Sequence, residues 1–219
     1  VDSGAKAEEA GPASPRIAEA VIDGLLPVAP SEFMTGAGIV PGAEFAIIAM
    51  GKLGGREMTA SSDLDLVFVY DVPEGVESSN GSKSLSPTLY FARLAQRLIS
   101  ALTTPTAAGT LYDVDMRLRP SGNKGPAAVS LKSFTDYHAR ESWTWEHLAL
   151  TRARLVAGPE TLRARIEAQI AMRLTTPRKR SRILADARDM RDKIAAQYPG
   201  RNRWDLKYAP GRLVDIEFL

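Results

Sequence analysis

The chain has 219 residues, of which 44% are hydrophobic, and this is enough apolar material for one large domain with a sizeable core. Its formal net charge of +2 argues against a dedicated nucleic-acid surface, and the lack of cysteine excludes disulfides and thiolate metal sites. The chain has no apolar run long enough to span a membrane and no signal-peptide pattern, so we expect a cytoplasmic protein that makes no membrane contact.

The N-terminal segment is poor in large apolar residues. Residues 1–15 therefore predict a linker or a disordered N-terminus. Arg16–Leu26 has apolar residues at helical spacing and predicts a short helix. We expect residues 16–132 to form the core of the domain.

Two apolar runs of strand length, Phe45–Met50 and Leu64–Tyr70, flank a glycine-rich turn and a polar loop. Side chains alternate across a strand, so Asp63 and Asp65 point the same way. Neighbouring carboxylates repel each other unless a cation lies between them, and oxygen ligands favour Mg²⁺. The pattern predicts a divalent metal site.

The loop between these two strands has the composition of a phosphate-binding loop. Gly54 and Gly55 expose backbone amides, and Lys52 and Arg56 add positive charge. We group the adjacent Ser62 with these nucleotide-binding candidates. Together with a metal site, the loop predicts a nucleoside triphosphate ligand, although it matches neither the Walker A nor the Rossmann pattern.

A second group of charged residues lies in the segment Leu111–Arg119. If this segment is a strand, alternation places Asp113, Asp115, Arg117 and Arg119 on one face and apolar residues on the other. The planar guanidinium group suits bidentate phosphate binding, so this face predicts an acid beside a phosphate clamp. The alternative is the solvated face of an antiparallel sheet, which the pairing with the upstream acids makes less favourable.

The segments around this strand are simpler to interpret. Val72–Ser86 is rich in Ser, Gly and Pro and predicts a mobile loop. A helix opens at Pro87, with Arg93 and Arg97 on its solvated side, and Ala127–Ser130 predicts a short strand.

The last part of the chain, residues 133–219, predicts a helical segment with closing strands of the same domain. The expected helices are Ser133–His138, Glu141–Val156, Pro159–Leu174 and Arg178–Gln197, followed by two strands, or a strand and a helix start, at Arg203–Tyr208 and Leu213–Phe218. Because the chain stops inside an apolar segment, we expect it to be truncated at the C-terminus.

Several residues of this region are candidates for the rim of the site or for the core. Glu146, Arg152 and Arg154, together with Lys124 from the preceding turn, are rim candidates whose roles stay open. We interpret Trp143, Trp145 and His147 as core anchors of a helix.

The order of Gly-Gly, polar loop and Asp-x-Asp resembles the DNA polymerase β-like nucleotidyltransferase superfamily. This resemblance implies an α+β fold, a mixed sheet with flanking helices followed by a helical segment, and a third acid, for which Asp115 qualifies. Residues 40–219 further resemble the bifunctional glutamine synthetase adenylyltransferase/adenylyl-removing enzymes, through the motifs MGKLGGREMTASSDLDLVFVYD, LYDVDMRLRPSGNKG, ESWTWEHLALTRARLV and WDLKYAPGRLVDIEFL.

Those enzymes carry two nucleotidyltransferase domains, and this chain has one motif set. The runs WTWEHLALTRAR and VDIEF resemble the adenylylating half. The resemblance therefore implies transfer of AMP from ATP to a tyrosine of glutamine synthetase, releasing pyrophosphate and lowering ammonia assimilation when nitrogen is plentiful. It also implies two Mg²⁺ ions held by Asp63, Asp65 and Asp115, and a PII signalling protein as a partner of regions outside this chain.

Three alternatives stay open at this point. The removing half would instead phosphorolyse adenylyl-tyrosine on glutamine synthetase and release ADP. A polymerase-like enzyme acting on nucleic acid is opposed by the balanced charge. A non-catalytic regulatory module is opposed by the three intact acids.

Overall fold

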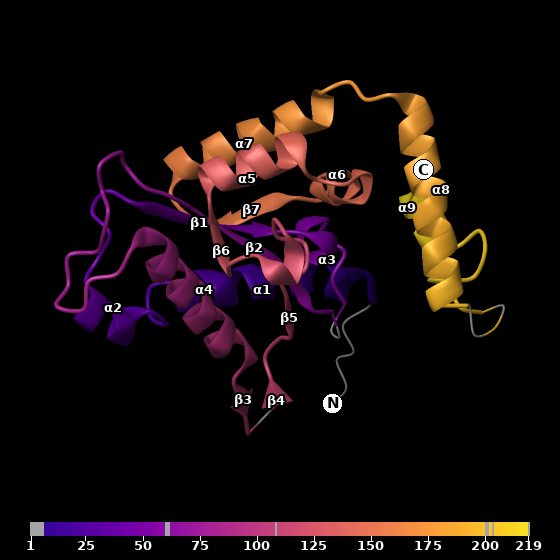
Figure 1. The fold of residues 1–219 in the computed structure, drawn as a ribbon. Helices are drawn as coiled ribbons and strands as arrows, with labels where there is room; N and C mark the ends of the chain where they lie inside the picture. Colours follow the sequence, from indigo (N-terminus) through magenta and orange to yellow (C-terminus); the bar gives the residue numbers. More distant parts are fainter. Residues whose placement is uncertain (1–6, 60–61, 108, 200–201, 203, 219) are drawn as a thin grey trace.

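The computed structural model describes residues 7–59, 62–107, 109–199, 202 and 204–218, without the side chains of 7–12 (Figure 1). The helices are α1 Ala7–Leu25, α2 Ser31–Ala37, α3 Gly51–Gly54, α4 Pro87–Thr103, α5 Leu131–Arg140, α6 Thr144–Leu150, α7 Glu160–Thr175, α8 Arg180–Gln197 and α9 Leu213–Glu217, with a 3₁₀ turn at Gly122–Lys124. The strands are β1 Glu44–Ala49, β2 Leu64–Asp71, β3 Pro105–Thr106, β4 Gly109–Thr110, β5 Val114–Asp115, β6 Ala128–Ser130 and β7 Arg154–Ala157.

The main sheet is mixed and runs in the order β5-β2-β1-β7, with β6 also paired to β2. Strand β1 is antiparallel to both β2 and β7, and β2 is parallel to both β5 and β6. The start of β2 pairs with β5 and its end pairs with β6, so the two short strands share one edge of β2. The expected α+β class, with a mixed sheet and flanking helices, is confirmed.

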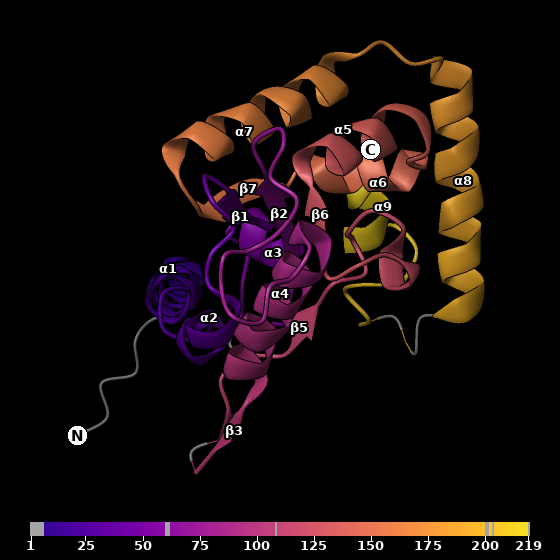
Figure 2. The ribbon, with the colours of Figure 1, turned by 60° about the vertical axis from the view of Figure 1, so that its left-hand side comes forward.

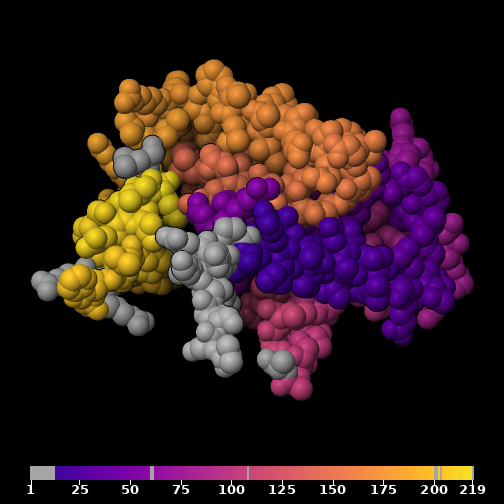
Figure 3. Space-filling view, turned by 180° about the vertical axis from the view of Figure 1, so that it is seen from behind, coloured from indigo at the N-terminus to yellow at the C-terminus, as the bar shows by residue number. Residues whose placement is uncertain are grey.

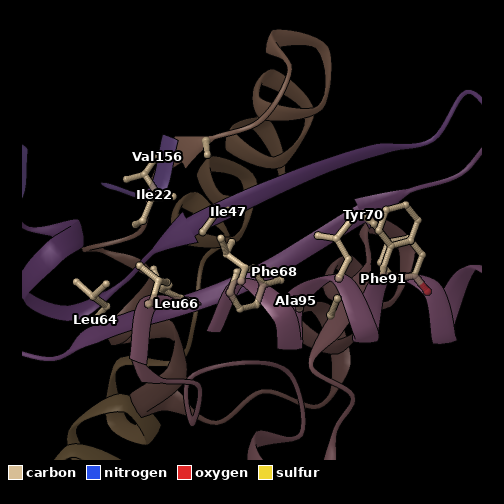
Figure 4. Packing of buried hydrophobic residues seen from close by; sticks show 14 of the residues in the cluster. Ile22, Ile47, Leu64, Leu66, Phe68, Tyr70, Phe91, Ala95 and Val156 are labelled. Atoms are coloured by element: carbon tan, nitrogen blue, oxygen red, sulfur yellow. The ribbon is translucent and has the colours of Figure 1, made fainter. Parts of the chain in front are cut away.

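The sheet is covered on both faces because β1 and β2 are apolar in nearly every position. On one face Ile47 and Phe68 pack against α1, α2 and α4, and Phe91 of α4 extends this layer (Figure 4). On the other face Ile48 and Val67 pack against α5 and α7. Residues that alternate along a strand therefore enter two different cores, which fixes the register of both central strands.

Helix α4 begins where the sequence predicts, after Ser86 and with proline at its first position. Its apolar stripe is buried, including Phe91, Leu98 and Leu102. The Phe91 ring stacks on Tyr70 of β2 with centroids 4.4 Å apart. This packing anchors the C-terminal end of β2, the strand that carries Asp65 near its start. None of the described helices is both long and apolar enough to cross a membrane.

The loop 72–86, which the sequence predicts to be mobile, is mostly exposed and is hydrogen-bonded to the end of α2. The backbone N–H of Asn80 donates to Ile39 O at 3.0 Å, and the Asn80 side chain accepts from Ile39 N at 2.9 Å. The N–H of Gly81 donates to Ala37 O at 3.0 Å. A Cβ at Gly81 would overlap the backbone of Ala37 and Gly38, so the two segments lie in direct contact.

Other differences concern element boundaries. Helix α1 begins at Ala7, whereas the sequence predicts a linker as far as residue 15; residues 1–6 lie outside the described residues. The expected helix Glu141–Val156 is wrong in its second half, because α6 ends at Leu150 and β7 follows. Strand β7 forms because its apolar residues pair with the edge of β1, a partner from a distant part of the sequence.

The C-terminal part differs as well. The described residues of 203–208 form turns, so the expected strand is wrong there. Helix α9 lies where the sequence predicts either a second strand or the start of a helix, and it confirms the helix alternative. Asp186 of α8 accepts a hydrogen bond from Thr144 of α6, and Arg191 of α8 pairs with Asp215 of α9. Helix α8 thus stands beside the sheet domain in direct contact with α6, and α9 lies below α6 in the view of Figure 2.

Candidate active site

Two of the predicted acids lie opposite each other on neighbouring strands. Asp65 of β2 is the register partner of Asp115 of β5 in a parallel pair, and the bond from Leu64 N to Asp113 O, at 2.8 Å, fixes this pairing. Asp63 lies just before β2, and its side chain is exposed. The fold therefore joins residues about fifty positions apart at one edge of the sheet, as the sequence predicts.

The three carboxylates influence one another electrostatically. The pKa of Asp65 is raised to about 6, first by burial and then by the negative charges of Asp63 and Asp115. The positive charges of Arg117 and Lys52 act in the opposite direction. A half-buried acid among like charges is a typical feature of a functional site.

Asp115 is held by Arg117. The Arg117 backbone N–H donates to Asp115 Oδ1 at 2.8 Å, and its Nε donates to Oδ2 at 2.7 Å. Burial raises the pKa of Asp115, but these hydrogen bonds and the charge of Arg117 outweigh it, so the net pKa is lowered. The Asp115 side chain is 14% exposed and that of Arg117 is 74% exposed, so a partly buried carboxylate is paired with a solvent-facing guanidinium group.

The donor chemistry of this edge fits Mg²⁺. All three side chains offer hard oxygen ligands, and a cation beside Asp65 would relieve the repulsion that raises its pKa. Across the described residues no three acidic or histidine side chains lie close enough together to form a complete metal-binding group. In this structure Arg117 donates hydrogen bonds to both oxygens of Asp115.

The glycine-rich turn forms the short helix α3, which begins beside Asp65. Gly51 has a φ of +51°, and a Cβ there would overlap Asp65 Oδ2, so the carboxylate lies directly against the loop backbone. Gly54 is buried, and a Cβ there would overlap the carbonyl oxygen of Arg152. At Gly54 the missing side chain therefore leaves room for the protein backbone, whereas at Gly51 it leaves room for the carboxylate of Asp65.

The other predicted residues of this loop separate into two groups. Lys52 is exposed and its charge acts on Asp65, and Arg56 is exposed with a φ of +60°. Gly55 is partly exposed and has room for a Cβ. Ser62 is buried, and its hydroxyl accepts from Thr59 N at 2.9 Å, which closes the polar loop before β2. Lys52 is thus the loop cation whose charge lowers the pKa of Asp65.

The sequence predicts that Arg119 shares a strand face with Asp115, and this prediction is wrong. Strand β5 ends at Asp115 and the chain turns, so the side-chain alternation expected over Leu111–Arg119 stops there. The Arg119 guanidinium group donates to the carbonyls of Met116 at 2.7 Å, Pro126 at 3.0 Å and Gly125 at 3.2 Å. Arg119 holds the turn together and acts on Asp115 only through its charge, whereas Arg117 donates hydrogen bonds to that carboxylate.

The family model for glutamate-ammonia ligase adenylyltransferase matches residues 5–169. The chain belongs to this family. It is 49% identical over 210 residues to a bifunctional glutamine synthetase adenylyltransferase/adenylyl-removing enzyme of Brucella suis biovar 1 (strain 1330), covering 96% of this chain and 21% of that protein. Enzymes of the same name from Rhodopseudomonas palustris (strain TIE-1) and Mesorhizobium japonicum are 50% and 45% identical, over 97% and 96% of this chain.

The chain spans about a fifth of the length of these curated relatives, since 21% of each is covered. The matched region carries the acids, the glycine-rich loop and Arg117 of the family member described here. The comparisons name both activities of the relatives, adenylyl transfer and adenylyl removal, and do not distinguish them for this chain.

One rim candidate, Arg154, has a structural role, because it binds the backbone of the glycine-rich loop. Arg154 of β7 donates to Leu53 O at 2.8 Å and to Gly54 O at 3.1 Å, and pairs with Glu19 of α1 at 2.6 Å. It therefore fixes the end of α3 from the side away from the acids. Nothing in the local sequence marks this contact, because its partners lie far away along the chain.

The remaining candidates lie around α6. Glu146 is buried, and it accepts hydrogen bonds from Tyr137 OH and from Trp143 N, both at 2.7 Å, so it caps the helix. Arg152 pairs with Glu57 at 3.4 Å and with Glu217 at 3.2 Å. Trp143 is 70% exposed, so its interpretation as a core anchor is wrong. Lys124 lies exposed in the 3₁₀ turn.

Proposed function

We propose that this chain transfers AMP from ATP to a tyrosine hydroxyl of glutamine synthetase and releases pyrophosphate. The observation that carries the proposal is the register pairing of Asp65 with Asp115, next to Asp63. The family membership supports it, because the relatives are named for action on glutamine synthetase. Transfer to this protein substrate is an inference from those names.

In this proposal the tyrosine oxygen attacks the α-phosphorus of ATP and releases its proton to solvent, and the bond from that phosphorus to the bridging oxygen of the β-phosphate breaks, so that pyrophosphate leaves. Asp63, Asp65 and Asp115 would hold two Mg²⁺ ions, which supply charge neutralisation and activate the attacking hydroxyl. Lys52 and Arg117 would bind the triphosphate and offset the charge that develops on pyrophosphate. Arg117 would exchange its bonds to Asp115 for bonds to phosphate oxygens.

Secondary roles follow from the contacts of each residue. We assign Gly55 and Arg56 to phosphate contact, Gly54 and Ser62 to the shape of the loop, and Arg119 to the shape of the turn that presents Arg117. The lowered pKa of Asp115 keeps it ionised, which suits a metal ligand better than a proton acceptor.

The accessibility of the acidic edge supports a protein substrate. Asp63 and Lys52 are exposed, and the Arg117 side chain is 74% exposed. A tyrosine on the surface of another protein needs such an open approach, because its backbone cannot enter a closed pocket. We infer that glutamine synthetase docks over the edge formed by β2 and β5.

The second candidate is the removing reaction, phosphorolysis of adenylyl-tyrosine to ADP. The acids serve both directions equally, so the choice rests on the resemblance of the segments 143–154 and 213–218 to the adenylylating half. Arg152 connects these two segments through its ion pair with Glu217. A PII signalling protein would act through regions outside this chain, and the cytoplasmic location expected from the sequence stays a prediction.

The decisive test offers both substrate pairs to the chain, alone and joined to the remaining length of a curated relative. Unmodified glutamine synthetase should acquire label from ATP labelled on its α-phosphate, in the presence of Mg²⁺. Adenylylated glutamine synthetase with inorganic phosphate should yield no ADP. If ADP forms and no label is transferred, the chain is the removing half and the proposal is wrong.

A further inference from the structure

A cavity of about 390 Å³ lies beside the acidic edge, between the sheet domain and the helices that follow it. Its lining is mainly apolar and aromatic, and includes Trp145 and Leu148 of α6, Tyr198 after α8, and Phe218 after α9. Seen from behind, the C-terminal segment in yellow lies against violet residues of the glycine-rich region (Figure 3). The proposed chemistry assigns no role to this cavity.

The cavity and the acids share a wall. Gly51 lines the cavity, and its backbone lies against the carboxylate of Asp65. Leu118 also lines it and follows Arg117, the residue bonded to Asp115, by one position. A ligand anchored at the acids would therefore have the cavity immediately next to it.

We propose that this cavity takes the purine base of the nucleotide whose triphosphate binds at the acids. The inference rests on the proposed function and adds the element that selects the nucleotide. A volume of about 390 Å³ lies within the roughly 300–1,000 Å³ of small-molecule sites. An apolar cavity next to a charged edge matches the two ends of a nucleoside triphosphate.

The aromatic side chains of the cavity suit a flat base. The rings of Tyr198 and Tyr208 stack with centroids 4.8 Å apart and planes 15° apart, and Trp145 and Phe218 add further aromatic surface. Bases bind such surfaces by stacking on their π-faces. Lys207 lies over the Tyr208 ring at 5.0 Å, which places a cation at the border of the aromatic group.

Charge within the cavity is largely compensated. Arg152 and Glu217, both in the lining, pair with each other at 3.2 Å. A larger cavity of about 560 Å³, between α5, α6 and α8, is lined by the cations Arg140, Arg178 and Arg182. That basic cavity suits an anion, and its lining includes none of the residues at the acidic edge. The apolar cavity is the better base site, both because of its lining and because it adjoins the acidic edge.

The chain offers a matched pair of tryptophans for a test. Trp145 lines the cavity, whereas Trp143, two positions away, is 70% exposed and is not part of its lining. Tyr198 supplies a second variant at a position that is 45% exposed, where truncation removes little from the core. Far-UV circular dichroism and thermal unfolding would establish that each variant is folded.

Isothermal titration calorimetry should compare Mg·ATP with Mg·tripolyphosphate, which has the phosphates but no base. We expect Trp145→Ala and Tyr198→Ala each to weaken ATP binding about tenfold, or about 1.4 kcal/mol. Binding of tripolyphosphate should stay within about twofold of the unmodified chain. Trp143→Ala should change neither ligand, and Asp65→Asn should weaken both.

The other outcomes would contradict the base site, the proposed function or both. Unchanged ATP affinity in both cavity variants, or equal losses for ATP and tripolyphosphate, would overturn the base site. If Trp145→Ala does not fold, Tyr198→Ala alone decides. If Asp65→Asn binds both ligands normally while the cavity variants lose ATP, the proposed function fails and the base site stands. An unmodified chain that binds no ATP would overturn both.

Discussion

Two regions of the molecule contain ionisable side chains with displaced pKa values. At the acidic edge of the sheet, the pKa of Asp65 is raised to about 6 by burial and by two neighbouring acids. Between α5, α6 and α7, the pKa of His138 is lowered to about 4 by burial and by the positive charge of His147 and Arg173. In both regions burial is the largest cause and like charges add to it.

The surroundings of the two groups differ. Asp65 borders an exposed lysine and an exposed arginine, which can exchange partners with a ligand. His138 is 4% exposed, and its ring packs on Phe134 at 4.6 Å and on Tyr137 at 5.4 Å. A displaced pKa therefore marks a site only where mobile counter-charges and solvent also reach the group. We regard the histidine as part of the core.

The largest expected effect separates the two regions by activity. Asp65→Asn should lower AMP transfer by more than about a thousandfold, or about 4 kcal/mol on the barrier, because a metal ligand is lost. Its thermal unfolding should stay unchanged or improve slightly, since the charged form of a half-buried acid with a raised pKa costs stability at neutral pH. Asp113→Asn, an exposed neighbour of β5, is the matched control. Equal losses in both variants would show that the edge is structural.

The next effect concerns the histidine and acid stability. Above pH 6.5 His138 is neutral in the folded and the unfolded chain alike, so its titration does not change the free energy of unfolding. As the pH falls from 6.5 to about 4, the unfolded chain gains a proton that the folded chain refuses, so the free energy of unfolding should drop by up to about 3 kcal/mol. Urea unfolding of the wild type and of His138→Phe between pH 4 and 7 measures this. The variant should lose that part of the pH dependence and keep its transfer activity at pH 7.

Asp65 should respond in the opposite sense over the same range. Its folded pKa of about 6 lies above the ordinary aspartate pKa of 3.8, so the folded chain gains stability as the pH falls through 6 towards 4. The stability advantage of Asp65→Asn over the wild type should therefore shrink as the pH falls. An advantage that grows on acidification would contradict the assignment of the raised pKa.

A smaller effect distinguishes the arginines. Arg117→Ala should lower kcat/KM for ATP more than about tenfold, or about 1.4 kcal/mol, with little change in melting temperature. Arg119→Ala should lower both activity and melting temperature, because it removes bonds to three carbonyls of the turn. Arg93→Ala, on the outer side of α4, should change neither. Identical behaviour of the variants at 117 and 119 would restore the single phosphate clamp that the sequence predicts.

Much of this arrangement could be predicted from local patterns. The apolar runs of β1 and β2 and the helical stripe of α4 are set by side-chain period, which is a local property. The meeting of Asp65 with Asp115 was also predictable, because the resemblance to the nucleotidyltransferase superfamily requires a third acid on a separate strand. The first prediction needed only residues adjacent in the sequence, and the second needed the resemblance.

The errors arise where a distant partner decides the structure. Residues 154–157 continue a helical pattern, yet they form β7 because the edge of β1 is available to them. Arg119 follows the alternation of Asp115, yet β5 ends early because the turn carbonyls bind its guanidinium group. The role of Gly54 is likewise set by the carbonyl of Arg152, nearly a hundred residues later. Such contacts leave no periodic signal.

The most direct test of the central claim is calorimetric binding of ATP to the chain at pH 6, with and without Mg²⁺, in buffers of different ionisation enthalpy. Asp65, with a pKa of about 6, is about half protonated there, so Mg·ATP binding should release about half a proton per site and should release almost none at pH 8. Asp65→Asn should abolish both the release and most of the affinity. Tight ATP binding that needs neither Mg²⁺ nor Asp65, and releases no proton at pH 6, would contradict the account.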